Sequence, residues 1–215
     1  MIPVCRSRRL AAFPAALAIG LVAFAGTSAS PASAASLGVS CPGATTQPFR
    51  PWSDPAFYAF VPNGGFEHGS DGWTLAGGAA VRSGNEPFHV SGTGSNSLAL
   101  PAGSSAATPP MCIGLLSTKM RFFAVNTGSP SAMLKVQVVY RGGLGTVLGT
   151  VGSTLGVSDA GYITNTGGWE PTPAISMLGG VLPLLTQSVQ FRFQPVGQAG
   201  NWRIDDVYLD PLMHR

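Results

Sequence analysis

Charged residues are scarce in this sequence, at 10% of 215 residues, and after residue 9 the basic ones form no run or stripe. The sequence gives no reason to expect nucleic acid or an anionic membrane as a partner. It also has no long segment with the 3.6-residue apolar period of an amphipathic helix, because glycine and proline interrupt it every few residues. These features argue against a helical bundle and against a nucleic-acid-binding protein.

Motifs of the common enzyme classes are also missing. The chain has no G-x-S-x-G elbow, no H-E-x-x-H pair and no cysteine cluster for zinc. Glu86 with Asp54 or Glu170 stays open as a carboxylate pair for glycoside hydrolysis. We therefore expect no enzyme and name no catalytic residue, with a small secreted hydrolase as the weakest of three functional interpretations.

The one long apolar run lies near the N-terminus. Basic residues within 6–9 precede an apolar segment at 10–26, and Ala-Ser-Ala ending at Ala34 is a small-residue cleavage site. The run is short and contains Pro14, so a cleaved secretory signal at residues 1–34 is favoured over a retained anchor. We expect an extracellular protein with no stable membrane insertion after cleavage. Nine of the 12 basic residues would remain beside nine acidic ones, giving a net charge of zero.

Only three cysteines occur, and Cys5 lies in the predicted signal. In an exported chain the remaining pair, Cys41 and Cys112, predicts one disulfide. The bond would tie an N-terminal arm at residues 35–60 to the middle of the domain. Lipid modification of Cys41 is a poor alternative, because GVSC lacks the usual leucine three places before the cysteine.

Short strand patterns, in contrast, are abundant. Apolar and polar residues alternate in SVQFRFQP (188–195) and AMLKVQVVY (132–140), and three more strands are expected at 97–100, 119–126 and 202–209. Glycine, asparagine and proline separate these patterns as turn residues. Short strands joined in this way predict an all-β sandwich or barrel.

Two separated motifs resemble a known family. NGGFE at residues 63–67, followed by Trp73, stands near the start, and WRIDDVYLDP at residues 202–211 stands near the end. In this order they resemble the galactose-binding-like jelly rolls, especially secreted bacterial carbohydrate-binding modules. The resemblance implies a jelly-roll β-sandwich, expected at residues 61–215. It also implies a non-catalytic domain that binds extracellular carbohydrate or a cell-envelope glycan.

The resemblance further implies a structural calcium ion at the edge where the two motifs meet. By position its ligands would be Glu67 and Asp205, with Asp206 as the alternative, and their hard oxygens suit Ca²⁺. These acids could instead pair with Arg203, meet solvent or cap turns. In either case Glu67 is expected to hold structure rather than to catalyse.

The spacing of the closing motif predicts an irregular strand. Ile204 and Val207 both look like core positions although they are an odd number of residues apart. A bulge near Asp205-Asp206 would reconcile them.

A sugar site needs exposed aromatic rings beside polar groups. Trp73 and Trp202 belong to strand motifs and are expected inside, whereas Tyr162 and Trp169 flank the polar, loop-like stretch TNTGG. Tyr162 and Trp169 are therefore the predicted ligand-binding residues, with loop residues folded back on the domain as the open alternative. The competing interpretation is a structural or protein-interaction β-sandwich without a sugar site.

Overall fold

The computed structural model describes residues 41, 43–112, 119–142, 154–164, 167–176 and 186–210. These residues all fall within one compact unit, Ser36–Arg215. In this part of the chain the secondary structure is almost entirely β, and the single helical turn is the 3-10 turn η1 at Arg50–Trp52. No helix among these residues has the length and apolar character needed to cross a membrane.

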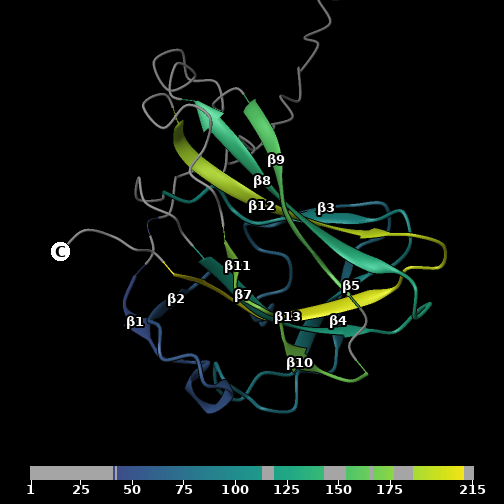
Figure 1. Ribbon diagram of the computed structural model, residues 1–215, viewed down its shortest axis with the longest axis horizontal. Helices are drawn as coiled ribbons and strands as arrows, with labels where there is room; N and C mark the ends of the chain where they lie inside the picture. Colours follow the sequence, from purple (N-terminus) through teal and green to yellow (C-terminus); the bar gives the residue numbers. More distant parts are fainter. Residues whose placement is uncertain are drawn as a thin grey trace, which may run out of the picture. The chain divides into compact units, whose positions relative to one another are not determined.

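The strands form two antiparallel sheets that lie in separate layers (Figure 1). The eight-stranded sheet contains β1 (Thr45–Thr46), β2 (Tyr58–Phe60), β4 (Ala80–Ser83), β5 (Asn96–Leu100), β7 (Lys119–Asn126), β10 (Glu170–Pro171), β11 (Ile175–Ser176) and β13 (Trp202–Asp210). The five-stranded sheet has the order β3 (Thr74–Ala76), β6 (Ser105–Ala107), β12 (Thr186–Val196), β8 (Met133–Gly142), β9 (Thr154–Ile163). The predicted all-β jelly-roll sandwich is confirmed.

The core lies between the two sheets, because alternate residues of each strand point toward the opposite layer. Leu134 and Val136 on β8 and Phe191 and Phe193 on β12 are all fully buried. From the facing sheet, Phe122 on β7 meets Phe193 edge to face with 5.1 Å between ring centres. The alternation visible in the sequence of β8 and β12 therefore identifies the inward faces of these strands correctly.

Strand β13 occupies the centre of the eight-stranded sheet. It pairs with β7 along one side and with β5 and β2 along the other. Its register with β7 shifts between Asp205 and Tyr208, which marks a β-bulge. Because of this bulge, Ile204 and Val207 are both fully buried although they are an odd number of residues apart. The predicted bulge near Asp205-Asp206 is confirmed.

Part of the segment predicted as an arm belongs to the sheet. Strand β2 pairs with both β1 and β13. Phe49 and Tyr58 pack with Phe123 and Tyr208 in a second apolar cluster outside the main core. Residues on both sides of the predicted boundary at residue 61 therefore belong to the eight-stranded sheet. The sequence did not indicate β2, because three residues are too few to show a strand pattern.

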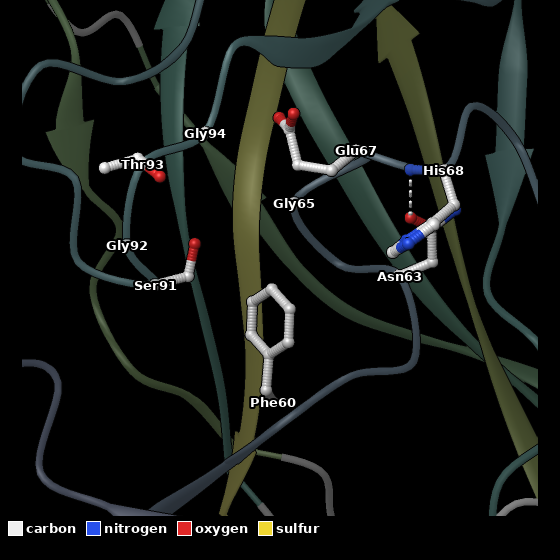
Figure 2. A pocket seen from close by; sticks show the side chains of 9 residues that line it. All are labelled: Phe60, Asn63, Gly65, Glu67, His68, Ser91, Gly92, Thr93 and Gly94. Atoms are coloured by element: carbon white, nitrogen blue, oxygen red, sulfur yellow. Dashed lines mark hydrogen bonds between the residues drawn. The ribbon is translucent and has the colours of Figure 1, made fainter.

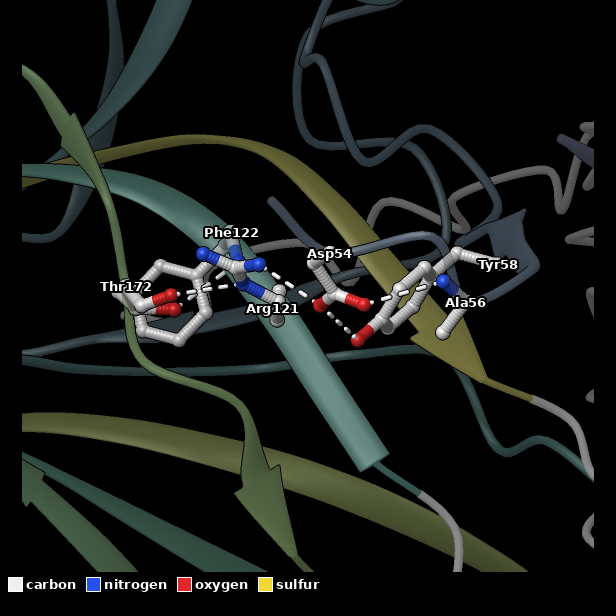
Figure 3. Close-up of polar contacts among 6 residues, drawn as sticks. All are labelled: Asp54, Ala56, Tyr58, Arg121, Phe122 and Thr172. Atoms are coloured by element: carbon white, nitrogen blue, oxygen red, sulfur yellow. Dashed lines mark hydrogen bonds and ion pairs between the residues drawn. The ribbon is translucent and has the colours of Figure 1, made fainter. Parts of the chain in front are cut away.

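A mostly buried ion pair fixes the arm to β7 (Figure 3). Arg121 Nη1 lies 2.7 Å from Asp54 Oδ2, and the Tyr58 hydroxyl donates to the same oxygen at 2.8 Å. Arg121 Nε also donates to the carbonyl oxygen of Thr172 at 2.8 Å. Partial burial acts to raise the pKa of Asp54, but the hydrogen bonds from Arg121 and Tyr58 outweigh it and lower that pKa. The carboxylate stays charged, and one guanidinium joins three separate segments.

The predicted disulfide between Cys41 and Cys112 is present, with 4.9 Å between the Cα atoms. Cys112 directly follows Met111, which forms an isolated β-bridge to Val189 on β12. The bond therefore links the arm covalently to a segment that pairs with β12 of the five-stranded sheet.

Removing this bond is expected to destabilise the domain. For the 71-residue separation of the two cysteines, the chain-entropy relation gives a loss of about 4 kcal/mol in the free energy of unfolding. Urea unfolding of the Cys41→Ser/Cys112→Ser double variant, compared with the oxidised and the reduced wild type, measures this loss. An oxidised wild type with the same midpoint as the double variant would contradict the expectation.

Candidate functional site

The opening segment Asn63–Glu67 packs against the bulge of β13. Gly64 N donates to the carbonyl oxygen of Val61 at 2.8 Å, and Val207 N donates to that of Gly64 at 3.2 Å. A β-carbon at Gly64 would lie 2.8 Å from the Val207 carbonyl oxygen, so this position requires glycine. Phe66 then turns into the core with a φ of 60°. The segment is thereby held against the last strand.

Glu67 ties this segment to the residues that lead into β5. Its Oε1 accepts hydrogen bonds from the backbone N–H groups of Ser95 and Asn96, both at 2.8 Å. Its Oε2 accepts one from Asn96 Nδ2 at 3.2 Å. The exposed carboxylate therefore joins two loops, which agrees with a structural rather than a catalytic role.

Three further carboxyl groups, on Glu86, Asp205 and Asp206, are fully buried. Asp205 accepts the N–H of Glu86 at 3.0 Å and that of Asp206 at 2.8 Å. Asp206 accepts the N–H of Ser91 at 2.8 Å and its hydroxyl at 2.5 Å. Glu86 in turn accepts the N–H of Val90 at 2.9 Å and also the N–H of Phe88. Carboxyl oxygens of Asp205 and Asp206 on β13 thus hold the backbone of the loop at 86–91.

These buried carboxyls have raised pKa values. Burial raises the pKa of Asp205 to about 8, and the neighbouring charges of Asp206 and Glu86 add to the rise, while two backbone hydrogen bonds oppose it. Burial likewise raises the pKa of Glu86 and of Asp206 from the ordinary values of these groups. All three groups are closed off from solvent.

The arrangement does not offer the calcium ligands that the resemblance implies. Among the described residues, no group of three or more His, Cys, Asp or Glu side chains is placed to hold a metal ion. Backbone N–H groups donate to the carboxyl oxygens of Glu67, Asp205 and Asp206. These hydrogen bonds take lone pairs that a cation would need. Calcium at Glu67 and Asp205 therefore rests on the resemblance alone, and the side chains as arranged do not fit it.

A hollow of about 380 Å³ opens between the opening segment and the loop before β5 (Figure 2). One part of the hollow is lined by Phe60, Asn63, Glu67 and His68, and the other part by residues 91–94. No spacing in the sequence indicates this hollow, because its walls come from separate loops that meet only in the folded chain.

Tyr162 lies on β9, with its ring on the outer face of the five-stranded sheet and 47% exposed. Its hydroxyl donates to Asp159 Oδ2 at 3.1 Å. The other oxygen of Asp159 accepts Gln137 Nε2 at 2.9 Å and lies 3.0 Å from Lys135 Nζ. The ammonium of Lys135 is also 5.9 Å from the centre of the Tyr162 ring. One exposed ring thus stands in a fixed group of three polar side chains.

Trp169 lies elsewhere, immediately before β10 of the other sheet. Its ring is partly buried against the second apolar cluster, and the Arg203 guanidinium lies 6.0 Å from its centre. The two predicted ligand-binding residues therefore belong to different sheets. The three polar partners of Tyr162 were missed, although alternation along β8 places Lys135 and Gln137 on its polar face.

The raised pKa values predict that acid stabilises the domain. The unfolded chain loses the Asp205 proton near pH 3.8, whereas the folded chain keeps it up to about pH 8, so the folded state binds more protons between these values. The free energy of unfolding should fall as pH rises from 5 to 8, by on the order of 1 kcal/mol per pH unit for one such group. Urea unfolding at several pH values measures the slope, and Asp205→Asn should flatten it. A free energy of unfolding that stays constant or rises with pH over this range would refute the assignment.

The geometry also predicts the response to calcium. Because three N–H donors reach the Glu67 carboxylate and two reach Asp205, too few oxygen lone pairs remain for a calcium ion, and the melting midpoint of metal-stripped protein should not move when calcium is added. Magnesium serves as the matched control for ionic strength. A midpoint that rises with calcium alone and falls again with chelator would establish the calcium site that the resemblance implies.

Comparison with known proteins supports the fold. No family model matches the chain. No curated protein matches it either. Solved structures do match, at low identity.

Two of these are xylanase fragments with family 22 carbohydrate-binding modules. The CBM22-1 and GH10 modules of Clostridium thermocellum xylanase 10B, complexed with xylohexaose, are 14% identical and align over 74% of this chain and 29% of theirs, with a TM-score of 0.51. The tandem CBM22 modules of Paenibacillus barcinonensis xylanase Xyn10C are also 14% identical and align over 73% and 46%, with a TM-score of 0.50. This chain thus spans less than half of each of these longer chains.

A third match is the family 61 module TmCBM61, solved in complex with β-1,4-galactotriose. It is 18% identical and aligns over 70% of this chain and 96% of its own, with a TM-score of 0.47. At such identities the likeness concerns the fold alone. This chain has the jelly-roll β-sandwich fold found in carbohydrate-binding modules, as its opening and closing motifs predict.

Proposed function

We propose that this chain is a secreted, non-catalytic domain that binds an extracellular polysaccharide or cell-envelope glycan. The observation that carries the proposal is the exposed Tyr162 ring beside Lys135, Gln137 and Asp159. Secretion rests on the signal-like residues 1–34, and the fold shared with carbohydrate-binding modules supports the class of ligand.

The Tyr162 ring suits a sugar because it is both exposed and oriented. Tyrosine offers a large amphipathic surface with only two rotatable side-chain bonds, so little conformational entropy is lost when a ligand packs on it. The hydroxyl bond to Asp159 and the adjacent Lys135 ammonium restrain the ring further. A sugar can place its C–H groups on such a face without rearranging the sheet.

The polar neighbours can fix the sugar's orientation. The hydrogen bond with Asp159 raises the pKa of Lys135, and those from Gln137 and Lys135 lower the pKa of Asp159, so both groups are charged at neutral pH. Lys135 keeps N–H donors, and Gln137 keeps its carbonyl oxygen, for sugar hydroxyls. Donors and acceptors on a rigid sheet, next to one aromatic ring, are what a selective sugar site requires.

The described carboxyls support a non-catalytic role. Glycoside hydrolysis needs a proton-donating acid with access to the glycosidic bond. In the part of the chain that the structure describes, the carboxyls with raised pKa are Glu86, Asp205 and Asp206, and all three are buried under backbone N–H groups. Asp54, a possible partner of Glu86, is engaged by Arg121.

One observation favours the competing protein-binding function. Phe57, Phe88 and Phe60 are 55%, 44% and 38% exposed. Phe88 also contacts the Trp52 ring, with 5.0 Å between centres. Exposed apolar rings of this kind are common at protein interfaces.

The first test replaces Tyr162 by alanine. Purified domain is passed over insoluble and soluble polysaccharides, including xylan, β-1,4-galactan and cell-wall preparations. Loss of the ring should weaken binding to the retained glycan at least tenfold, which corresponds to about 1.4 kcal/mol. Phe57→Ala removes another exposed ring and serves as the matched control, with retention unchanged.

Trp169→Ala separates the two predicted ligand residues in the same assay. Because its ring packs partly inside, the variant should lower the melting temperature and leave retention unchanged. Folded wild type that no glycan retains would move the assignment to the protein-binding function.

A further inference from the structure

The hollow beneath the opening segment has the chemistry of a second ligand site, separate from the Tyr162 face. Figure 2 shows Phe60 at one end, Glu67 at the other, and Ser91 and Thr93 along one side. Its volume of about 380 Å³ is near the lower end for small-molecule pockets, which suits a single ring better than an extended chain.

The apolar part of the pocket is the Phe60 ring. This ring is 38% exposed and is supported from behind by Tyr208, with 5.0 Å between ring centres. A β-carbon at Gly65 would lie 3.3 Å from the tip of the Phe60 ring and 3.6 Å from Ser91 Oγ. Glycine at this position therefore leaves the space between the Phe60 ring and the polar groups unfilled.

Three polar groups of the lining, on Asn63, Glu67 and Ser91, face a ligand as hydrogen-bond acceptors, while His68 and the Thr93 hydroxyl can also donate. The Ser91 hydroxyl gives its hydrogen to Asp206, so its oxygen can only accept from a ligand. Both amide hydrogens of Asn63 are taken, by the carbonyl oxygens of Gly69 and Asp71. Three N–H donors reach the Glu67 carboxylate, which has about four acceptor positions and so keeps one on Oε2.

The charge around the pocket is also one-sided. Glu67 lies at its rim, and the buried carboxyl group of Asp206 lies behind it, where a β-carbon at Gly65 would be 3.0 Å from Oδ1. No lysine or arginine is among the residues that line it. The Glu67 carboxylate would repel an anionic ligand there, whereas it would attract a ligand that carries N–H and O–H donors and a positive charge.

We propose that this pocket binds one hexosamine ring, with the sugar's C–H face on Phe60 and its ammonium group at Glu67. A sugar is favoured over a simple alkylammonium group because the acceptors are spread over Asn63, Glu67 and Ser91, and several hydroxyl donors can use them. The site depends on loops that do not include Tyr162, so it does not rest on the proposed sheet-face site.

Titration of the ¹⁵N-labelled domain with monosaccharides tests the proposal. Glucosamine should shift the amide signals of His68, Ser91 and the residues between Ser91 and Asn96. Its affinity should be at least tenfold higher than that of glucose or of N-acetylglucosamine, which lack the ammonium charge. Glucuronate should cause no shift at these positions.

Two variants connect the result to the geometry. Glu67→Gln preserves the side-chain oxygen that Ser95 and Asn96 bind, and should remove the preference for glucosamine over glucose. Thr93→Val removes a hydroxyl group from the lining and leaves the hydrogen bonds between Glu67 and the N–H groups of Ser95 and Asn96 in place. It should weaken glucosamine binding in a domain with an unchanged melting temperature. Tyr162→Ala is the matched control and should leave these shifts unchanged, so the two sites can fail independently.

Other outcomes overturn the proposal. Equal affinity for glucosamine and glucose, or an unchanged preference in Glu67→Gln, would remove Glu67 as the ammonium partner. Shifts that map to β8 and β9 would assign glucosamine to the sheet face. An absence of shifts in the folded domain would show that the pocket does not bind this ligand.

Discussion

The central constraint on this structure is the burial of two adjacent carboxyls at the bulge of β13. A buried carboxyl needs hydrogen-bond donors, and the donors that satisfy Asp205 and Asp206 include backbone N–H groups of Glu86 and Ser91. The loop at 86–91 must therefore lie against β13. Glu67 adds a parallel tie from the opening segment to Ser95 and Asn96, so one end of the sandwich is built from loops held by carboxyl groups.

The two candidate ligand sites differ in how they are built. Tyr162 and its polar neighbours project from paired strands, where the backbone ladder fixes their spacing. The pocket beside Phe60 depends on side-chain to backbone bonds between loops. The sheet face is therefore rigid and shallow, whereas the loop pocket is concave and its shape depends on a few acceptors. Such a scaffold can carry two unrelated specificities without changing its core.

The sequence predicted those features that depend on neighbours along the chain. Alternation identified β8 and β12, and the odd spacing of Ile204 and Val207 indicated the bulge. The sequence left open whether Trp169 is exposed or folded back on the domain, because the cluster that partly buries it draws on Phe49 and Phe123, which are distant in sequence. The pocket and the Asp205–Glu86 bond escaped prediction for the same reason, since both need loops that only β13 brings together.

The place of β13 in the chain has a consequence for how the domain folds. It follows every other described strand in sequence, yet it pairs with β2, β5 and β7. The eight-stranded sheet cannot be completed until β13 is available. The pairings of β13 with β2, β5 and β7 all span long stretches of chain. Folding dominated by such non-local contacts is slow. During synthesis the eight-stranded sheet would thus remain incomplete until β13 has been made, and the edges of β2, β5 and β7 that pair with it would stay unpaired until then.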